Sequence, residues 1–312
     1  MDPTQTLFLV HIMDGYSFRN TIGIIKSERS TATMVLSPNA IEISFVNTNG
    51  CAVHKIHINT AELTMYIYNV RDENGMLLPE YPVAFETAQF LTTIRSIGRR
   101  DGLRFYCIKG DGKINIQPIK TAIKDPGQTG ASFVNIRNDE FTRYELPPAE
   151  FYSDEPNVRV IAKDFATFCT NANALKCTTI NIIGGMHKVV LQSVHANSSI
   201  ASVNTFCNQV NPSFNNINSS LNDEELDMLL ENIRIQEGPP STSSIKLNIV
   251  KKDEISCVKV PIATVKALSK IHNISPTGTQ LHFYFSPGKP TKIKSQIGTY
   301  GTYTICIRGI RV

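Results

Sequence analysis

The sequence is short of the features that mark membrane, secreted and fibrous proteins. It has no tryptophan, and no apolar run approaches the roughly 20 residues that cross a bilayer. Residues 1–10 lack the basic region, long apolar core and cleavage site of a secretory signal. We therefore expect an intracellular protein with no membrane partner.

Metal-binding and catalytic patterns are also missing. The seven cysteines are scattered and form no CxxC pair, so we expect neither a disulfide framework nor a zinc site. The motifs HExxH, GxSxG, GxGxxG and the Walker loop are absent. His54 and His57 would face opposite sides of a strand, which makes them a poor metal pair. We predict a protein that is not an enzyme and needs no metal or other cofactor.

The charges are nearly balanced, at 31 basic and 27 acidic residues, for a net charge of +4. This balance does not by itself mark a nucleic-acid binder, so the positions of the charges matter more than their number. Hydrophobic residues make up 41% of the 312 residues, which is a globular composition long enough for two domains.

Short segments rich in Val, Ile and Thr dominate the sequence, separated by turn residues. Lys113–Ile119 alternates apolar and polar side chains, which is typical of a strand with one solvated face. Gly110-Asp111-Gly112 before it is a good hairpin turn. The predicted strands are Thr31–Leu36, Ala40–Val46, Cys51–Ile58, Leu103–Lys109, Lys113–Ile119, Thr178–Ile183, His187–His195, Ile245–Val250, Ser256–Val260, Gln280–Phe285, Thr291–Ile297 and Thr302–Arg308.

Helical periodicity occurs in only four short segments. In the first, Phe18, Ile22 and Ile25 recur at i, i+4 and i+7, which leaves the opposite face polar. The other three segments show the same single apolar stripe. The predicted helices are Tyr16–Lys26, Glu86–Ile97, Lys163–Ala174 and Ile262–His272.

The order of these elements predicts an internal duplication. Each helix follows a strand and precedes a run of strands, which gives four strand–helix–strands units in two domains. We therefore predict an α+β fold with a first domain at 1–137, a connecting loop at 138–156 and a second domain at 157–312. A polar and acidic insert at about 208–244 interrupts the second domain, and Asp223–Ile235 within it could form a short helix.

Four regions in this order resemble the PCNA family of DNA sliding clamps. They are Met13–Ile22, Ala40–Asn47, Leu146–Phe151 followed by Val158–Phe165, and Pro290–Ile310. The resemblance implies two similar clamp-type domains with curved outer antiparallel sheets and four short helices on the concave face. It also implies a homotrimeric ring that encircles double-stranded DNA and acts as a polymerase processivity factor.

The polar faces of the helices carry the cations that such a ring needs. Lys and Arg attract phosphates without reading bases, which allows a protein to slide. Ordinary solvated helix faces are the competing interpretation. The predicted DNA-binding residues are Arg19, Asn20, Lys26, Arg95, Arg99, Arg100, Lys163, Lys266 and Lys270, although helix Lys163–Ala174 is otherwise poor in charge.

The resemblance implies two further surfaces. An apolar pocket under the connecting loop would receive short peptide motifs from DNA polymerase and other clients, and a clamp loader is a further implied partner. Its expected lining is Val46, Val53, Leu146, Phe151, Pro290 and Cys306. The expected subunit interface joins an edge near Ser132–Ile136 to Ser198–Phe206 of the next chain, through Ser132, Phe133, Val134, Ile200 and Val203.

The sequence also departs from the family. Arg308-Gly309-Ile310 stands where members usually carry a proline, the net charge is basic rather than acidic, and the insert is large. These departures would suit a clamp from a large DNA virus, acting in the nucleus or at a cytoplasmic replication site. The alternatives are a monomeric clamp-like DNA-binding processivity or transcription factor, and a structural β-rich protein of the capsid kind.

Overall fold

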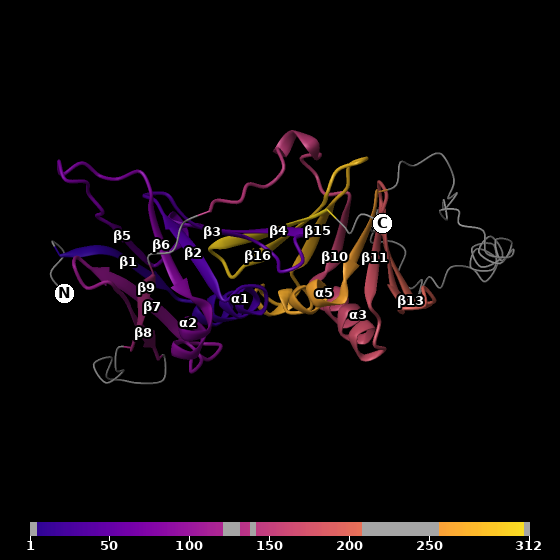
Figure 1. Ribbon diagram of the computed structural model, residues 1–312, viewed down its shortest axis with the longest axis horizontal. Coiled ribbons are helices and arrows are strands. Elements are labelled where there is room, and N and C mark those ends of the chain that lie inside the picture. The colour runs from indigo at the N-terminus through magenta and orange to yellow at the C-terminus, as the bar shows by residue number, and fades with distance from the viewer. Residues whose placement is uncertain (1–4, 121–131, 138–141, 208–255, 309–312) are drawn as a thin grey trace, which may run out of the picture. The chain divides into compact units, whose positions relative to one another are not determined.

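The computed structural model describes residues 5–120, 132–137, 142–207 and 256–308, without the side chain of Lys266 (Figure 1). The chain divides into two units, Met1–Cys207 with Ile255–Val312, and Asn208–Glu254. The second unit lies outside the described residues, as do the predicted strand at 245–250 and the predicted short helix at 223–235.

Antiparallel strands in the first unit form two sheets. The larger has the order β10-β15-β16-β17-β4-β3-β2-β6-β9-β8-β7-β1-β5, and the smaller has the order β13-β12-β11-β14. The strands are β1 Thr6–Ile12, β2 Thr31–Leu36, β3 Ala40–Val46, β4 Ala52–Asn59, β5 Met65–Tyr68, β6 Tyr81–Glu86, β7 Gly102–Ile108, β8 Lys113–Ile119, β9 Ser132–Arg137, β10 Val158–Ile161, β11 Thr179–Gly184, β12 Lys188–Val194, β13 Ile200–Cys207, β14 Ser256–Pro261, β15 Gln280–Tyr284, β16 Thr291–Ile297 and β17 Gly301–Ile307.

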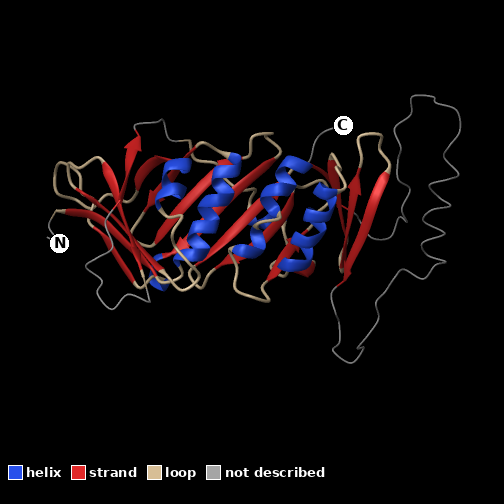
Figure 2. Cartoon of the chain, turned by 90° about the horizontal axis from the view of Figure 1, so that it is seen from below, coloured by secondary structure: helices blue, strands red, loops and turns tan. Residues whose placement is uncertain are grey.

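Four α-helices of the described residues lie side by side across one face of the sheets (Figure 2). Each buries its apolar stripe against the strands, as the periodicity predicts. The helices are α1 Gly15–Glu28, α2 Thr87–Thr93, α3 Ala162–Ala174 and α5 Ile262–Leu268, and the 3₁₀ turns are η1 Thr60–Glu62, η3 Ala149–Phe151 and η4 Ile271–Asn273.

The start of α1 follows from two local features. The Asp14 carboxylate accepts hydrogen bonds from the Ser17 amide at 3.0 Å and from the Ser17 hydroxyl at 2.6 Å, which caps the helix. Gly15 lies against β7 so closely that a Cβ there would come within 3.0 Å of the Asp101 carbonyl oxygen. A larger residue at this position would push the helix off the sheet.

Two predicted helices are shorter than expected. The segment Glu86–Ile97 is helical only from Thr87 to Thr93, and it continues as tighter turns in which Ile97 N bonds to Ile94 O. The segment Ile262–His272 leaves the α-helix after Leu268 and ends in η4. Helix ends commonly tighten in this way, because the last carbonyls have no partner further along the helix.

The predicted duplication is present in the order of the elements. Helices α1 and α3 are each followed by three consecutive strands, ending at β4 and β13, and helices α2 and α5 are each followed by strands ending at β9 and β17. The two halves are joined where β17 pairs with β4, from Gly301 opposite Ile58 to Ile307 opposite Ala52. Strands β9 and β13 are the counterparts of this joined pair.

A continuous core lies between the helices and the sheets, and aromatic rings fill its first half. The ring of Phe18 on α1 lies 6.1 Å from Phe90 on α2 and 5.5 Å from Phe105 on β7. In the second half Phe165 on α3 meets Phe283 on β15 at 5.7 Å. Packing of this kind holds each helix in one rotational setting, which decides which side chains it exposes.

One buried histidine makes the stability of this core depend on pH. His54 on β4 is fully buried, its Nδ1 lies 2.6 Å from the Tyr303 hydroxyl, and its ring stacks on Phe45 at 4.6 Å. Burial disfavours the charged imidazolium, which lowers the pKa of His54 to about 3. Below pH 6.5 the unfolded chain therefore takes up a proton at His54 that the folded chain does not.

We expect this difference to cost about 2 to 3 kcal/mol of unfolding free energy between pH 7 and pH 4.5, since each pH unit below the unfolded pKa is worth about 1.4 kcal/mol. Urea unfolding of the wild type and of His54→Gln at pH 7, 5.5 and 4.5 measures it. The variant should lose less stability on acidification by that amount. Parallel pH profiles for the two proteins would contradict the assignment.

Candidate nucleic-acid interface

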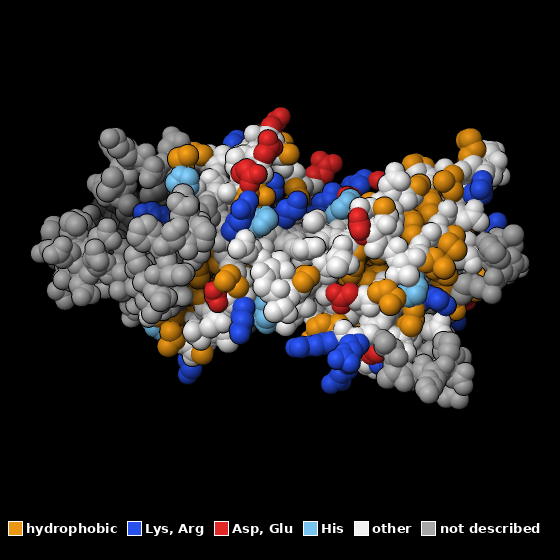
Figure 3. All heavy atoms as spheres, turned by 180° about the vertical axis from the view of Figure 1, so that it is seen from behind, with side chains coloured by type: hydrophobic (Ala, Val, Ile, Leu, Met, Phe, Trp, Pro, Cys, Tyr) orange, Lys and Arg blue, Asp and Glu red, His pale blue; other side chains and the backbone are white. Residues whose placement is uncertain are grey.

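The exposed face of the four helices is rich in cations. Lys26 on α1, Lys163 on α3 and Lys270 just after α5 are all exposed. Figure 3 shows Lys and Arg side chains projecting at its lower edge, which is where the helices lie in Figure 1. The exposed cations of this face, which we call the helix face, are Lys26, Arg95, Arg99, Arg100, Lys163 and Lys270.

Few carboxylates oppose these charges on the described helices. Glu28 at the end of α1 is only 8% exposed, and burial raises the pKa of its carboxyl despite a Thr48 backbone hydrogen bond and the nearby Lys270 charge. Asp164 in the first turn of α3 is exposed, next to Lys163. The helix face therefore carries a clear excess of positive charge, as the sequence predicts.

Two predicted DNA-binding residues hold the fold together instead of pointing freely outward. The Arg19 guanidinium donates to the carbonyl oxygens of Arg95 at 3.3 Å and Ile97 at 2.6 Å, which fastens α1 to the turn after α2. The Asn20 amide donates to the Asn273 carbonyl at 2.8 Å, which links α1 to η4 in the other half. The carbonyl ends of helical turns attract such donors because their oxygens are otherwise unpaired.

Tyr16 forms an aromatic platform that sequence reasoning missed. The Arg19 guanidinium lies 4.5 Å from the centre of its ring, and that of Arg99 lies 5.8 Å away. A side-chain hydrogen bond with Asn20, together with the two arginines, lowers the pKa of the Tyr16 hydroxyl. The ring thus orders two cations at the edge of the helix face.

The remaining predicted cations differ in what they can contribute. Lys163 is the only cation of α3, and the side chains of Thr167 and Thr170 donate to carbonyl oxygens one turn back. This agrees with the predicted poverty of α3 in charge. The side chain of Lys266 lies outside the described residues.

The predicted peptide pocket corresponds to one cross-strand row on the sheet face opposite the helices. Val46, Val53 and Cys306 are direct partners on β3, β4 and β17. The two valines are half-buried, whereas Cys306 is 1% exposed. Among the residues predicted to line the pocket, Cys306 can therefore be only the floor of a site. Leu146, Phe151 and Pro290 are half-buried as well.

The side chains predicted for the subunit interface differ in how exposed they are. Phe133 on β9 is 49% exposed, and Ile200 and Val203 on β13 are 44% and 41% exposed. Ser132 is exposed as well, but Val134 is fully buried, because its side chain points into the core. Val134 can thus offer a neighbouring chain only its backbone, which is the part that strand pairing uses.

Other site types find little support. No group of three or more His, Cys, Asp or Glu side chains that could hold a metal occurs in the part of the chain that the structure describes. None of the described helices is long and apolar enough to cross a membrane.

Comparison with known proteins gives no match to a family model and no match to a curated protein. Solved structures do match. PCNA from Entamoeba histolytica is 11% identical with a TM-score of 0.66, covering 97% of this chain and 98% of its own. PCNA from Thermococcus kodakaraensis is 12% identical with a TM-score of 0.65, and the PCNA2–PCNA3 complex of Sulfolobus tokodaii is 12% identical with a TM-score of 0.64. Each of these two matches covers 96% of this chain and 98% of the other chain. The chain therefore has the two-domain α+β clamp fold of the PCNA sliding clamps.

Proposed function

We propose that this protein is a subunit of a DNA sliding clamp, a non-enzymatic homotrimeric ring that encircles duplex DNA and tethers a DNA polymerase and other replication proteins. The observation that carries the proposal is the helix face, where α1, α3 and the turns that follow α2 and α5 expose cations and little opposing charge. A clamp needs such a surface toward DNA, because contacts to phosphates hold the duplex without stopping movement along it.

The internal pairing of β17 with β4 supports ring closure. Their counterparts β9 and β13 carry exposed apolar side chains, Phe133 on one and Ile200 and Val203 on the other. In the four-stranded sheet β13 is an edge strand, and exposed edges of this kind are templates for pairing with another chain. Pairing of β9 with β13 of the next subunit would repeat the internal joint head to tail, which closes into a ring when the rotation allows it.

The cross-strand row Val46–Val53–Cys306 supports a client site. It lies on the face opposite the helices, so a peptide bound there would leave the helix face free for DNA. Short peptides bind through a few apolar anchors in such clefts. DNA polymerase and other proteins with short peptide motifs are the proposed occupants, and a clamp loader is the proposed means of placing the ring on DNA.

Light scattering over a range of protein concentrations tests the ring. We expect a mass near three times the 34.6 kDa of one chain, because each chain contributes one β9 and one β13 to the head-to-tail contact. A concentration-independent mass of one chain would contradict the ring. It would favour the alternative of a monomeric clamp-like factor that holds DNA by the helix face alone, with a steep dependence of affinity on salt.

A further inference from the structure

The segment 142–157, which precedes β10, forms an arch over the face of the large sheet opposite the helices. In Figure 1 it rises away from the strands and carries a helical turn, η3, at its top. Its first foot stands on β3, where the Tyr144 amide donates to the Ser44 hydroxyl at 3.1 Å. Its second foot stands beside β16, where the Tyr152 hydroxyl donates to the Pro290 carbonyl at 2.9 Å.

The arch crosses the predicted client row. Val46, Val53, Cys306 and Lys292 are successive partners on β3, β4, β17 and β16, so a segment that stands on β3 and beside β16 must pass over them. Three strand spacings amount to about 14 Å, whereas the chain from Tyr144 to Tyr152 can span about 26 Å. The chain in the arch is thus longer than the distance that it bridges, so the position of the arch depends on how firmly its two feet are held.

The second foot is held largely by burial. Tyr152 is 7% exposed, and the ammonium of Lys292 lies 4.8 Å from its ring centre. Phe151 beside it has the ammonium of Lys289 at 3.9 Å from its ring centre. The apolar part of this attachment, the burial of the Tyr152 ring, changes little with salt.

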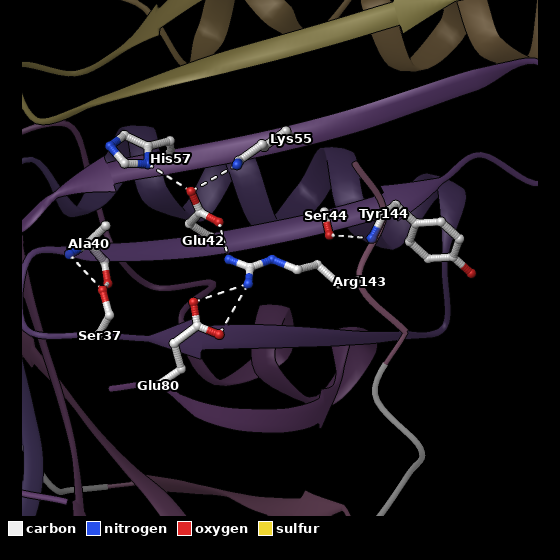
Figure 4. Close-up of polar contacts among 9 residues, drawn as sticks. All are labelled: Ser37, Ala40, Glu42, Ser44, Lys55, His57, Glu80, Arg143 and Tyr144. Atoms are coloured by element: carbon white, nitrogen blue, oxygen red, sulfur yellow. Dashed lines mark hydrogen bonds and ion pairs between the residues drawn. The ribbon is translucent and has the colours of Figure 1, made fainter. Parts of the chain in front are cut away.

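The first foot is held by charge (Figure 4). Arg143 donates from Nη1 to both carboxylate oxygens of Glu80 at 3.1 Å, and from Nη2 to Glu42 at 3.0 Å. The other oxygen of Glu42 lies 2.9 Å from Lys55 Nζ and 3.2 Å from His57 Nδ1. Glu42 is the centre of this network, and its side chain is only 19% exposed.

The Glu42 carboxylate stays ionised because basic side chains surround it. Burial opposes its charge, but hydrogen bonds from Lys55, Arg143 and His57 outweigh burial and lower its pKa to about 2. Glu42 therefore stays charged at any pH near neutrality. A network that shares one half-buried carboxylate holds better than an isolated surface pair, yet it remains sensitive to salt because Arg143 and Glu80 are about two-fifths exposed.

We infer that Arg143 is a positioning residue of the client site: its ion network fixes the first foot of the arch, so that a peptide meets the Val46–Val53 row under an ordered segment. This inference rests on the proposed clamp function for its client, but not for the arch itself. An ordered segment loses less conformational entropy when a peptide binds, which raises affinity without a new contact. High salt should loosen this foot and leave the second one in place.

Hydrogen exchange of the two hydrogen-bonded amides within 144–151, those of Tyr144 and Phe151, tests the arch without any client. We expect Arg143→Gln to speed exchange there by about tenfold or more, and Arg143→Lys to give an intermediate rate because it keeps the charge but not the fork of donors. Arg71→Gln, an exposed arginine outside the network, is the matched control and should change nothing at 144–151. In the wild type, high salt (about 1 M NaCl) should reproduce the effect of Arg143→Gln, and the variant should respond little to salt. Equal exchange in wild type and Arg143→Gln would overturn the inference.

The part of the inference that concerns the client peptide requires a binding experiment. Peptides selected by display on the wild-type protein, and retained only if Val53→Asp abolishes their binding, report on the row itself. We expect Arg143→Gln to weaken them about five- to tenfold and Arg143→Lys to restore part of the affinity, with Arg71→Gln unchanged. Equal affinity for the wild type and Arg143→Gln would overturn the positioning role. Failure to select any such peptide would overturn the proposed client site, whereas the exchange experiment would still decide whether Arg143 holds the arch.

Discussion

Charge reversal on the helix face is expected to abolish most DNA binding. A chain in which Lys26, Arg95 and Lys270 are all Glu should bind a short DNA duplex at least about 100-fold more weakly at about 50 mM salt, because each reversed cation can no longer neutralise a phosphate and release its counterions. The slope of log affinity against log salt should become shallower by about one for each phosphate that is no longer neutralised. Fluorescence anisotropy across a salt series measures both quantities.

Arg19 is left out of this set, because its guanidinium fastens α1 to the turn after α2 and its replacement would disturb the fold. The matched control reverses three cations outside the helices, with Arg71, Lys289 and Lys294 all changed to Glu, so the net charge of the chain is the same. Lys294 alternates along β16 with the buried Ile293 and therefore faces away from the helices. If both triple variants weaken DNA binding equally, net charge rather than the helix face is responsible.

Placing a carboxylate on β9 or on β13 is expected to dissociate the ring. Phe133→Asp and Val203→Asp should each reduce the mass from three chains to one at micromolar concentration, because each would bury an unpaired charge in the β9–β13 contact. Phe133 is 49% exposed in the single chain, with the Lys113 ammonium 4.4 Å from its ring centre, so its replacement should leave the subunit folded. Light scattering gives the mass, and circular dichroism checks the fold.

Met65→Asp is the control for the edge experiment. Met65 is 46% exposed on β5, which is an edge strand of the large sheet and has no part in the proposed contact. That variant should remain trimeric. A trimer that survives both Phe133→Asp and Val203→Asp would show that the chains meet elsewhere, and a monomer from Met65→Asp would point to β5.

Much of the fold could be read from local pattern. The strands Thr31–Leu36, Ala40–Val46 and Thr291–Ile297 occur with the predicted limits, because turn residues bound them and their side chains alternate or cluster as strands require. Strands β5 and β6 were not predicted, and both lie in a stretch where the alternation is weak. Helix ends were the least accurate, since the last turns depend on tertiary partners.

For the candidate sites too, local pattern predicts some features and only tertiary contacts reveal others. That Lys26 and Lys270 are exposed follows from the helical period, since the apolar stripe fixes the opposite face. No local pattern reveals that the Arg19 guanidinium donates to carbonyl oxygens 76 and 78 residues away. Nor does any reveal that Arg143 meets Glu42 and Glu80, which lie 101 and 63 residues away.

The sequence by itself determined the class of elements, the duplication and the faces of the helices, because these depend on neighbours within a few residues along the chain. Only the tertiary structure decided which polar side chains of the helices fasten the fold, that Val134 and Cys306 are buried, and that the connecting segment is an arch with one charged foot. Such features depend on groups brought together from distant positions. Pairing, burial and charge compensation act through distance in space, and that distance is set only when the strands and helices pack.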